Sequence, residues 1–96
     1  MSAERFAEVR NWLQKYLSLA ETIALLANMD SDWDKAGVDA QWLAYFEKEF
    51  RCRMQSGDEF WLYDSGPASW ANLCGERGLA LLRNGEVLAV MVFAMN

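Results

Sequence analysis

The chain has 96 residues, 53% of them hydrophobic, and its 14 acidic and 9 basic side chains leave a formal net charge of -5. This length allows one domain, residues 1–96, and the acidic balance argues against nucleic acid or an anionic membrane as the main partner. The chain has no histidine, which removes the usual zinc ligand and the usual general base. We therefore expect no cofactor and no metal site, and we favour a non-enzymatic protein over an enzyme.

The first ten residues, MSAERFAEVR, carry charges where a secretory signal needs an uninterrupted apolar stretch. No apolar run approaches the roughly 20 residues that cross a bilayer. We therefore expect a cytoplasmic protein that does not enter a membrane.

Apolar residues recur at helical spacing from Ala3 to Met29, with no glycine or proline between them and with Ser2 available as N-cap. This pattern predicts one long helix. Its apolar stripe is wider than a lone surface helix needs, which indicates burial on more than one side.

The segment from Asp30 to Gly37 is predicted to be a loop. Its aspartates alternate as the first ligands of a calcium loop do, but Lys35 stands where that loop has glycine and Gln41 where it has a bidentate glutamate. A solvated connection is therefore the better interpretation than a metal site.

A second helix is predicted from an N-cap at Asp39 to about Met54, with Gly57 as its terminator. Cys52 falls in this helix and Cys74 in a later loop. In a chain without a secretory signal the two cysteines are predicted to be free thiols.

After Gly57 the apolar period changes to that of a strand, predicted from Glu59 to Tyr63. Pro67 is then placed to open a single helical turn around Trp70. The sheet resumes with a hairpin in which Asn84-Gly85 supplies the positive φ angles of a two-residue turn. Its second strand is predicted to span residues 86–95, and the paired residues are predicted to be Arg83 with Glu86, Leu82 with Val87, Leu81 with Leu88, Ala80 with Ala89 and Leu79 with Val90.

Both faces of this hairpin are apolar, whereas two helices can cover only one face of a three-stranded sheet. The uncovered face predicts self-association. That face carries either Val90 and Val92 or Met91, Phe93 and Met95, and the predicted dimer contacts are Val90, Val92 and Phe93.

Three aromatic residues, Trp61, Tyr63 and Trp70, fall close together on the predicted first strand and the turn after it, and Arg77 follows. These four residues are the candidate ligand-binding or partner-binding site. Two interpretations stay open: a small apolar cluster that closes the end of the sheet, or a cleft or patch that recognises a partner. Arg77 would then either pair with Asp64 or Glu59 or accept an anion.

The last forty residues resemble a pattern that recurs in small uncharacterised bacterial proteins. The resemblance rests on Gly57-Asp58-Glu59-Phe60-Trp61, followed by Trp70, Leu73, Gly75, Gly78, Ala80, Arg83, Gly85 and Met95-Asn96. It implies one sheet-forming unit from Gly57 onward, and it implies no activity and no functional residue.

The predicted fold class is α+β, with two N-terminal helices packed on a three-stranded antiparallel sheet that includes a C-terminal β-hairpin. Two classes of function remain open. The first is a non-enzymatic acidic interaction protein, such as an adaptor, an inhibitor or an immunity-type factor, that forms a homodimer. The second is a small-ligand binding domain, or a minor enzyme, with an aromatic pocket. A concave pocket of several hundred Å³ at these aromatics would favour the second class, and a flat exposed patch the first.

Overall fold

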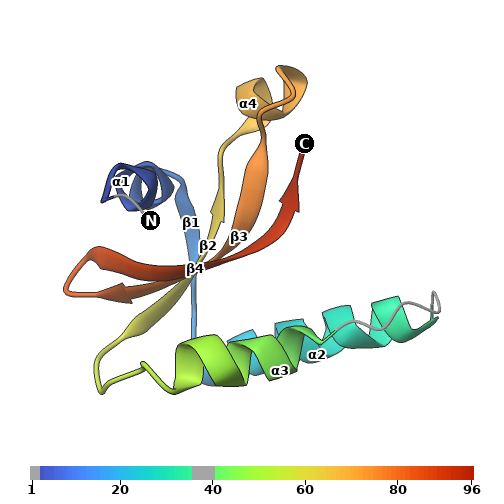
Figure 1. Ribbon diagram of the computed structural model, residues 1–96, viewed down its shortest axis with the longest axis vertical. Helices are drawn as coiled ribbons and strands as arrows, with labels where there is room; N and C mark the ends of the chain where they lie inside the picture. Colours follow the sequence, from blue (N-terminus) through green and yellow to red (C-terminus); the bar gives the residue numbers. More distant parts are fainter. Residues whose placement is uncertain (1–2, 36–40) are drawn as a thin grey trace.

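The structure is a computed structural model that describes residues 3–35 and 41–96. Five helical segments and four strands follow one another in these ranges (Figure 1). Their order along the chain is α1 (Ala3–Asn11), β1 (Leu13–Leu17), α2 (Leu19–Lys35), α3 (Trp42–Phe46), the π-helical η1 (Glu47–Arg51), β2 (Glu59–Asp64), α4 (Pro67–Ala71), β3 (Glu76–Arg83) and β4 (Glu86–Met95).

The strands form an antiparallel sheet in the order β1-β2-β3-β4, so each strand pairs with its neighbour in the chain. The predicted α+β class is confirmed. The predicted three strands are wrong, because the described part of the chain contains a fourth strand, β1, at the edge beside β2. The sheet is strongly twisted, and the β3-β4 hairpin bends away from the other strands (Figure 1).

The fourth strand lies inside the segment predicted to be one long helix. A new helix begins after it with a capping box, in which the Ser18 hydroxyl accepts a hydrogen bond from the Glu21 amide at 3.1 Å and the Glu21 carboxylate accepts one from the Ser18 amide at 3.0 Å. Residues 13–17 instead pair with β2, from Leu13 opposite Tyr63 to Leu17 opposite Phe60. Hydrogen bonding along a sheet edge therefore outweighs the local helical periodicity here.

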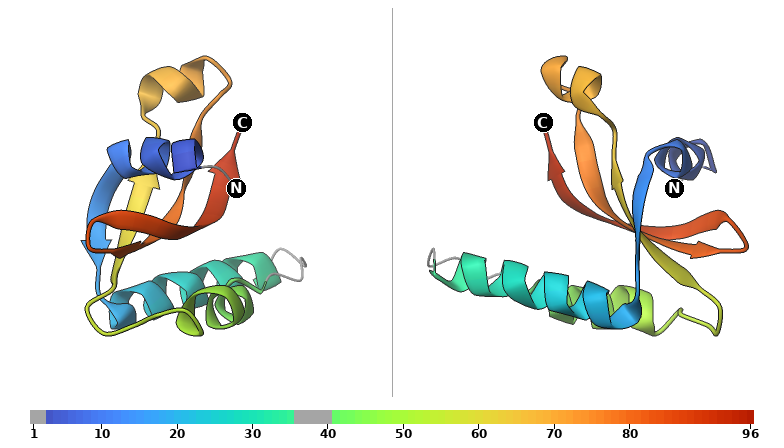
Figure 2. Two further views of the ribbon diagram at one scale, coloured as in Figure 1. Left: turned by 60° about the vertical axis from the view of Figure 1, so that its left-hand side comes forward. Right: turned by 180° about the vertical axis from the view of Figure 1, so that it is seen from behind.

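Helices cover both faces of the sheet, as the two views in Figure 2 show. On one face, Leu26 of α2 and the rings of Phe46 and Phe50, tilted against each other, pack on Phe60, Leu79 and their neighbours. On the other face, α1 places Val9 against a cluster whose other buried members are Tyr63, Ala80, Leu82 and Val87. The prediction of two helices on one face is therefore confirmed for α2 and the α3–η1 segment, but β1 divides the first predicted helix, and its N-terminal part, α1, folds onto the opposite side.

The β3-β4 hairpin has the predicted turn, with positive φ at Asn84 (54°) and Gly85 (80°). The predicted pairs Arg83 with Glu86 and Leu82 with Val87 are also confirmed.

The other predicted pairs of the hairpin are wrong. A bulge at Leu88 inserts one extra residue into β4, so Leu81 pairs with Ala89, Ala80 with Val90 and Leu79 with Met91. This shift by one residue exchanges the faces on which the rest of β4 presents its side chains.

The predicted loop at 30–37 is wrong from Asp30 to Lys35, because α2 continues to Lys35, and the rest of it lies outside the described residues. Asp30 does not compete with its own helix, since its carboxylate accepts hydrogen bonds from the backbone amides of Trp42 (2.7 Å) and Leu43 (3.2 Å) at the start of α3. The predicted N-cap Asp39 lies outside the described residues. Both cysteines, Cys52 and Cys74, are free and exposed.

Candidate functional site

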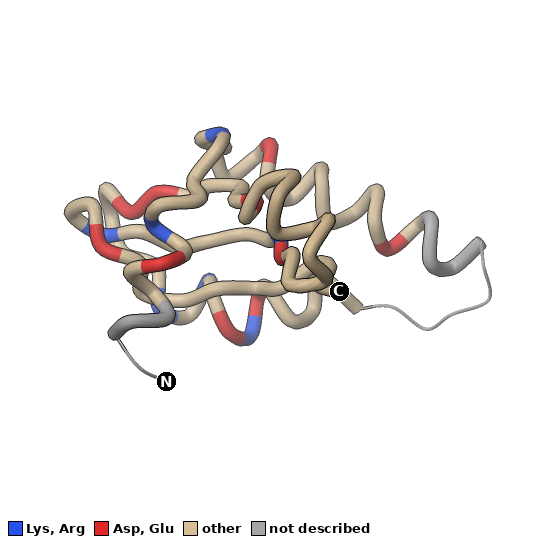
Figure 3. The backbone as a smooth tube through the Cα atoms, turned by 90° about the horizontal axis from the view of Figure 1, so that it is seen from above, with Lys and Arg blue, Asp and Glu red and all other residues tan. Residues whose placement is uncertain are grey.

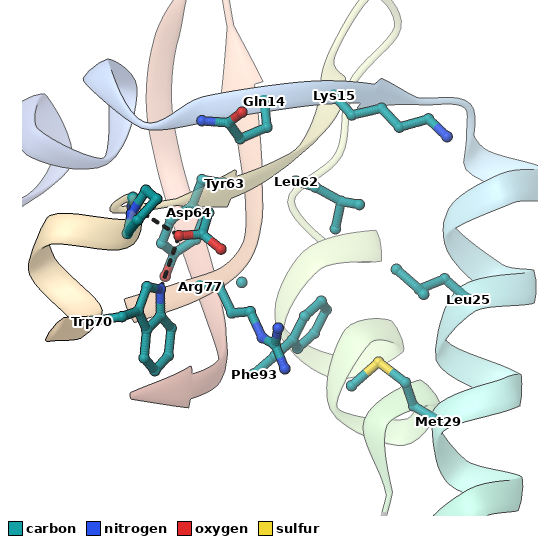
Figure 4. A pocket seen from close by; sticks show the side chains of 13 residues that line it. Gln14, Lys15, Leu25, Met29, Leu62, Tyr63, Asp64, Trp70, Arg77 and Phe93 are labelled. Atoms are coloured by element: carbon teal, nitrogen blue, oxygen red, sulfur yellow. Dashed lines mark hydrogen bonds between the residues drawn. The ribbon is translucent and has the colours of Figure 1, made fainter. Parts of the chain in front are cut away.

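A cavity of about 780 Å³ lies on the face of the sheet that α2 covers, at the end where α4 projects (Figure 4). The sheet forms its floor, α2 one wall and α4 the other. The residues that line it are Gln14, Lys15, Leu25, Met29, Leu62, Tyr63, Asp64, Gly66, Pro67, Trp70, Arg77, Gly78 and Phe93. The apolar members come from four different elements, so the cavity exists only in the folded chain.

Strand register brings two charged residues of this cavity together. Asp64 is the last residue of β2 and lies directly opposite Arg77 of β3. Directly paired residues project to the same face of a sheet, so both side chains reach the cavity. Lys15 lies opposite Leu62 in β1 and adds a second cation on the same side.

Trp70 is held in the cavity wall by three independent features. Its indole nitrogen donates a hydrogen bond to Asp64 Oδ1 at 2.9 Å, and its carbonyl oxygen accepts one from Asn96 Nδ2 at 3.0 Å. Gly75 lies against the ring, where a Cβ would stand only 2.2 Å from the indole Cδ2. The absence of a side chain at Gly75 therefore allows Trp70 to close the end of the sheet.

Asp64 is an ionised acceptor at neutral pH. The backbone amide of Gly66 (2.8 Å), the Trp70 indole and the positive charge of Arg77 together hold the pKa of Asp64 below its ordinary value, in that order of size. A carboxyl group that is already deprotonated and hydrogen-bonded cannot serve as a general acid near pH 7.

Arg77 is exposed, and its guanidinium lies over the Trp70 ring, 5.9 Å from the ring centroid. Among the residues that the structure describes, neither Arg77 nor Lys15 forms an ion pair within 4.0 Å. Both cations remain available to a bound group.

Tyr63 borders the cavity, but its polar end lies on the other face. Its hydroxyl donates a 2.5 Å hydrogen bond to the buried Glu76 carboxylate, and its ring stacks on Trp12 with centroids 6.3 Å apart. Gly78 makes room for it, since a Cβ there would lie 3.0 Å from the tyrosine ring. Tyr63 therefore supports the floor of the cavity from below.

Trp61 is the one member of the predicted site that does not line the cavity. It projects to the α1 face, where Tyr16 packs edge-on against it with centroids 5.9 Å apart and Glu59 accepts its indole hydrogen bond at 3.2 Å. The structure thus places Tyr63, Trp70 and Arg77 around one cavity and Trp61 on the opposite face.

The three residues predicted as dimer contacts are all half-buried and do not share a face. Val90 packs in the α1 cluster, whereas Phe93 packs in the α2 cluster, contacts Trp42 edge-on at 5.3 Å and lines the cavity. Val92 lies opposite Gly78.

Sequence reasoning missed Lys15, Leu25, Met29 and Leu62 as lining residues. The first three lie in the segment interpreted as one continuous helix, which gave no reason to associate them with the C-terminal sheet. The capping sequence Ser18-Leu19-Ala20-Glu21 was the signal that could have revealed the break.

The comparisons with known proteins add no functional assignment: no protein-family model, no curated protein and no solved structure matches this chain. Among the side chains that the structure describes, there is no group of three or more His, Cys, Asp or Glu residues that could hold a metal ion. Within residues 3–35 and 41–96, each helix is too short or too polar to span a bilayer.

Proposed function

We propose that this protein is a small-ligand binding domain and that its site is the cavity between α2, α4 and the sheet. The observation that carries the proposal is the cavity itself: about 780 Å³, mostly apolar in its walls, with two cations that lack ion-pair partners among the described residues. Ligand sites in proteins are typically concave, apolar and of roughly 300 to 1,000 Å³, with a few polar groups that orient the ligand.

Binding fits the side chains of this cavity better than catalysis. Its titratable groups are Lys15, Tyr63, Asp64 and Arg77, and no serine or cysteine is among the residues that line it. Asp64 is deprotonated, with a pKa low enough to make it a weak base, and Tyr63 donates its hydroxyl proton to Glu76, so neither is placed to act as a general acid on a ligand. The site can hold and orient a molecule, which is the activity we assign to it.

The test is a fragment titration of the ¹⁵N-labelled protein, followed by amide and indole chemical shifts. We expect fragments to perturb residues that line the cavity, with the Trp70 indole N–H among them. The substitution Met29→Trp should fill the cavity from α2 and abolish these shifts.

Ala7→Trp is the matched control, because Ala7 lines a separate cavity of about 460 Å³ beside α1. It should leave the perturbations at the α2 cavity intact. Shifts that survive Met29→Trp, or that cluster elsewhere, would contradict the proposal.

A second candidate function is that of an acidic interaction protein that works as a homodimer. The observation in its favour is an aromatic pair on the α1 face, where Tyr16 is 49% exposed and rests against the half-buried Trp61. Aromatic side chains of this kind are enriched where protein surfaces recognise each other. In either function we propose a cytoplasmic protein, which the free and exposed thiols of Cys52 and Cys74 support.

A further inference from the structure

The cavity has the opposite charge to the chain that forms it. The protein carries a net charge of -5, and Figure 3 shows acidic and basic positions interspersed along the described elements. The lining residues nevertheless include two cations, Lys15 and Arg77, and one carboxylate, Asp64. The cavity therefore has a local charge of one positive unit, which favours an anion.

The carboxylate of Asp64 does not neutralise this site by direct pairing. Its Oδ1 atom accepts hydrogen bonds from the Gly66 amide and the Trp70 indole, and the described residues contain no Asp64–Arg77 contact within the 4.0 Å of an ion pair. The guanidinium of Arg77 instead lies over Trp70 and extends from β3 into the cavity (Figure 4). Its donors face the space that a ligand would enter.

The rest of the lining is apolar. Leu25 and Met29 approach from α2, and Leu62 and Phe93 rise from the sheet (Figure 4). A ligand that satisfies Arg77 with its head would bury an apolar body against these side chains, and that burial would supply most of its affinity.

We propose that the ligand of this cavity is an amphipathic monocarboxylate, whose carboxylate pairs with Arg77 and whose apolar chain or ring packs between α2 and the sheet. This inference rests on the proposed binding function and adds the chemical class. A planar carboxylate matches the guanidinium fork through two parallel hydrogen bonds. One negative charge also balances the local positive unit, whereas a dianionic phosphate would leave one charge uncompensated.

The experiment titrates the protein with four probes that share one apolar body, a 3-phenylpropyl group: 4-phenylbutanoate, 4-phenylbutanamide, 3-phenylpropylamine and 3-phenylpropyl phosphate. Chemical shifts of the Trp70 indole N–H report the affinity. A charge-assisted hydrogen bond contributes enough that the carboxylate should bind about tenfold or more tightly than the amide, and the amine should bind weakest.

Variants locate the charge that makes this difference. Arg77→Gln should bring the carboxylate close to the affinity of the amide, and Arg77→Lys should restore part of the difference. Arg51→Gln is the matched control, because it removes the same charge from η1, where Arg51 pairs with Glu47 at 3.1 Å outside the cavity lining. It should leave all four affinities unchanged.

Equal affinity of the carboxylate and the amide at the cavity would overturn the monocarboxylate and leave the binding function intact. Tighter binding of the phosphate would also overturn it, in favour of a dianion. Failure of all four probes together with failure of the fragment titration would overturn both proposals. The comparison of probes on the unmodified protein decides the point even if an Arg77 variant does not fold.

Discussion

Single carboxylates in this chain each organise a different junction. Asp30 caps α3, Asp64 holds Trp70, and Asp58 joins the start of β2 to the end of β3. Asp58 Oδ1 and Oδ2 accept hydrogen bonds from Arg83 Nε and Nη2, each at 2.9 Å, and its side chain is 1% exposed. The carboxylates at the two ends of β2 therefore each hold a junction of the fold together.

We predict that Asp58→Asn lowers the free energy of unfolding at neutral pH by about 1 to 2 kcal/mol. This is less than a fully buried charged pair would lose, because Arg83 is 32% exposed and water screens its charge. Urea denaturation measures the change. Glu47→Gln, which breaks the exposed pair with Arg51, should change stability by less than about 0.5 kcal/mol. Equal effects of the two substitutions would contradict this role for Asp58.

The same pair predicts a pH dependence. Hydrogen bonds from Arg83 hold the pKa of Asp58 below its ordinary value of 3.8, so its contribution to stability is complete well above pH 3.8 and is lost as the pH falls through the lower folded-state pKa. The stability difference between the native protein and Asp58→Asn should be constant near neutrality and shrink in acid. A difference that grows on acidification would show that the sign is wrong.

Gly75 provides a second prediction at this scale. Gly75→Ala forces a methyl group into the Trp70 ring, and we expect about 1 to 3 kcal/mol of destabilisation with a chemical-shift change of the Trp70 indole N–H in the NMR spectrum. Gly57→Ala is the control, because nothing lies within 4 Å of a Cβ there and only its positive φ (91°) opposes the change. The control should leave the Trp70 spectrum unchanged. An unaltered spectrum in Gly75→Ala would mean that the ring is not packed against this glycine.

At the scale of elements, the β3-β4 hairpin sets the geometry of the sheet. Its turn aligns the first pairs, and the bulge at Leu88 then changes which side chains face α2. A second bulge at Phe93, between the pairs Gly78–Val92 and Arg77–Ala94, bends the strand where it passes the cavity. Bulges on an edge strand also interrupt the regular backbone pattern that another chain would need for pairing.

We predict that Gly85→Val destabilises the protein by more than about 1 kcal/mol, because a β-branched residue is strained at a φ of 80°. Space is not the cause, since a Cβ at Gly85 would meet only an Arg10 nitrogen, at 3.6 Å. Gly85→Asn, which tolerates positive φ, should cost less. The denaturation midpoint is the measurement, and equal midpoints for native protein and Gly85→Val would contradict the turn.

At the scale of the whole molecule, α1 provides the cover that the second face of the sheet needs. Val9 is fully buried there, with Phe6 and Trp12 beside it. The apolar hairpin face therefore does not by itself require a second subunit, and a dimer would have to use what α1 leaves open. That remainder includes Tyr16, half exposed beside Trp61.

Self-association stays a prediction, and we now expect the dimer contact to include Tyr16 and Trp61. We expect sedimentation at micromolar concentration to give twice the chain mass of 11.0 kDa, and Tyr16→Glu to give the monomer without loss of fold. Tyr45→Glu, on the exposed side of α3, is the matched control and should leave the dimer intact. A monomeric native protein would remove the second candidate function and leave the ligand site untouched.

The sequence by itself determined the parts of this protein that depend on neighbouring residues. Asn84 and Gly85 both tolerate positive φ, Pro67 opens a helix because its own ring sets φ, and alternation predicts a strand at residues 59–63. From these local rules followed the α+β class, the hairpin turn and the position of α4. The same rules identified Trp70 and Arg77 as candidate site residues, because both lie next to those elements in the sequence.

Only the tertiary structure decided the rest, because it depends on contacts between distant residues. Residues 13–17 have helical periodicity but form a strand, because they pair with the edge of β2. This strand separates α1 from α2, so α1 packs on the opposite face of the sheet. The bulge at Leu88 moves Phe93 into the α2 cluster, and the register of β2 with β3 sets Asp64 beside Arg77. The cavity is built from these long-range pairings, so no local pattern in the chain could have outlined it.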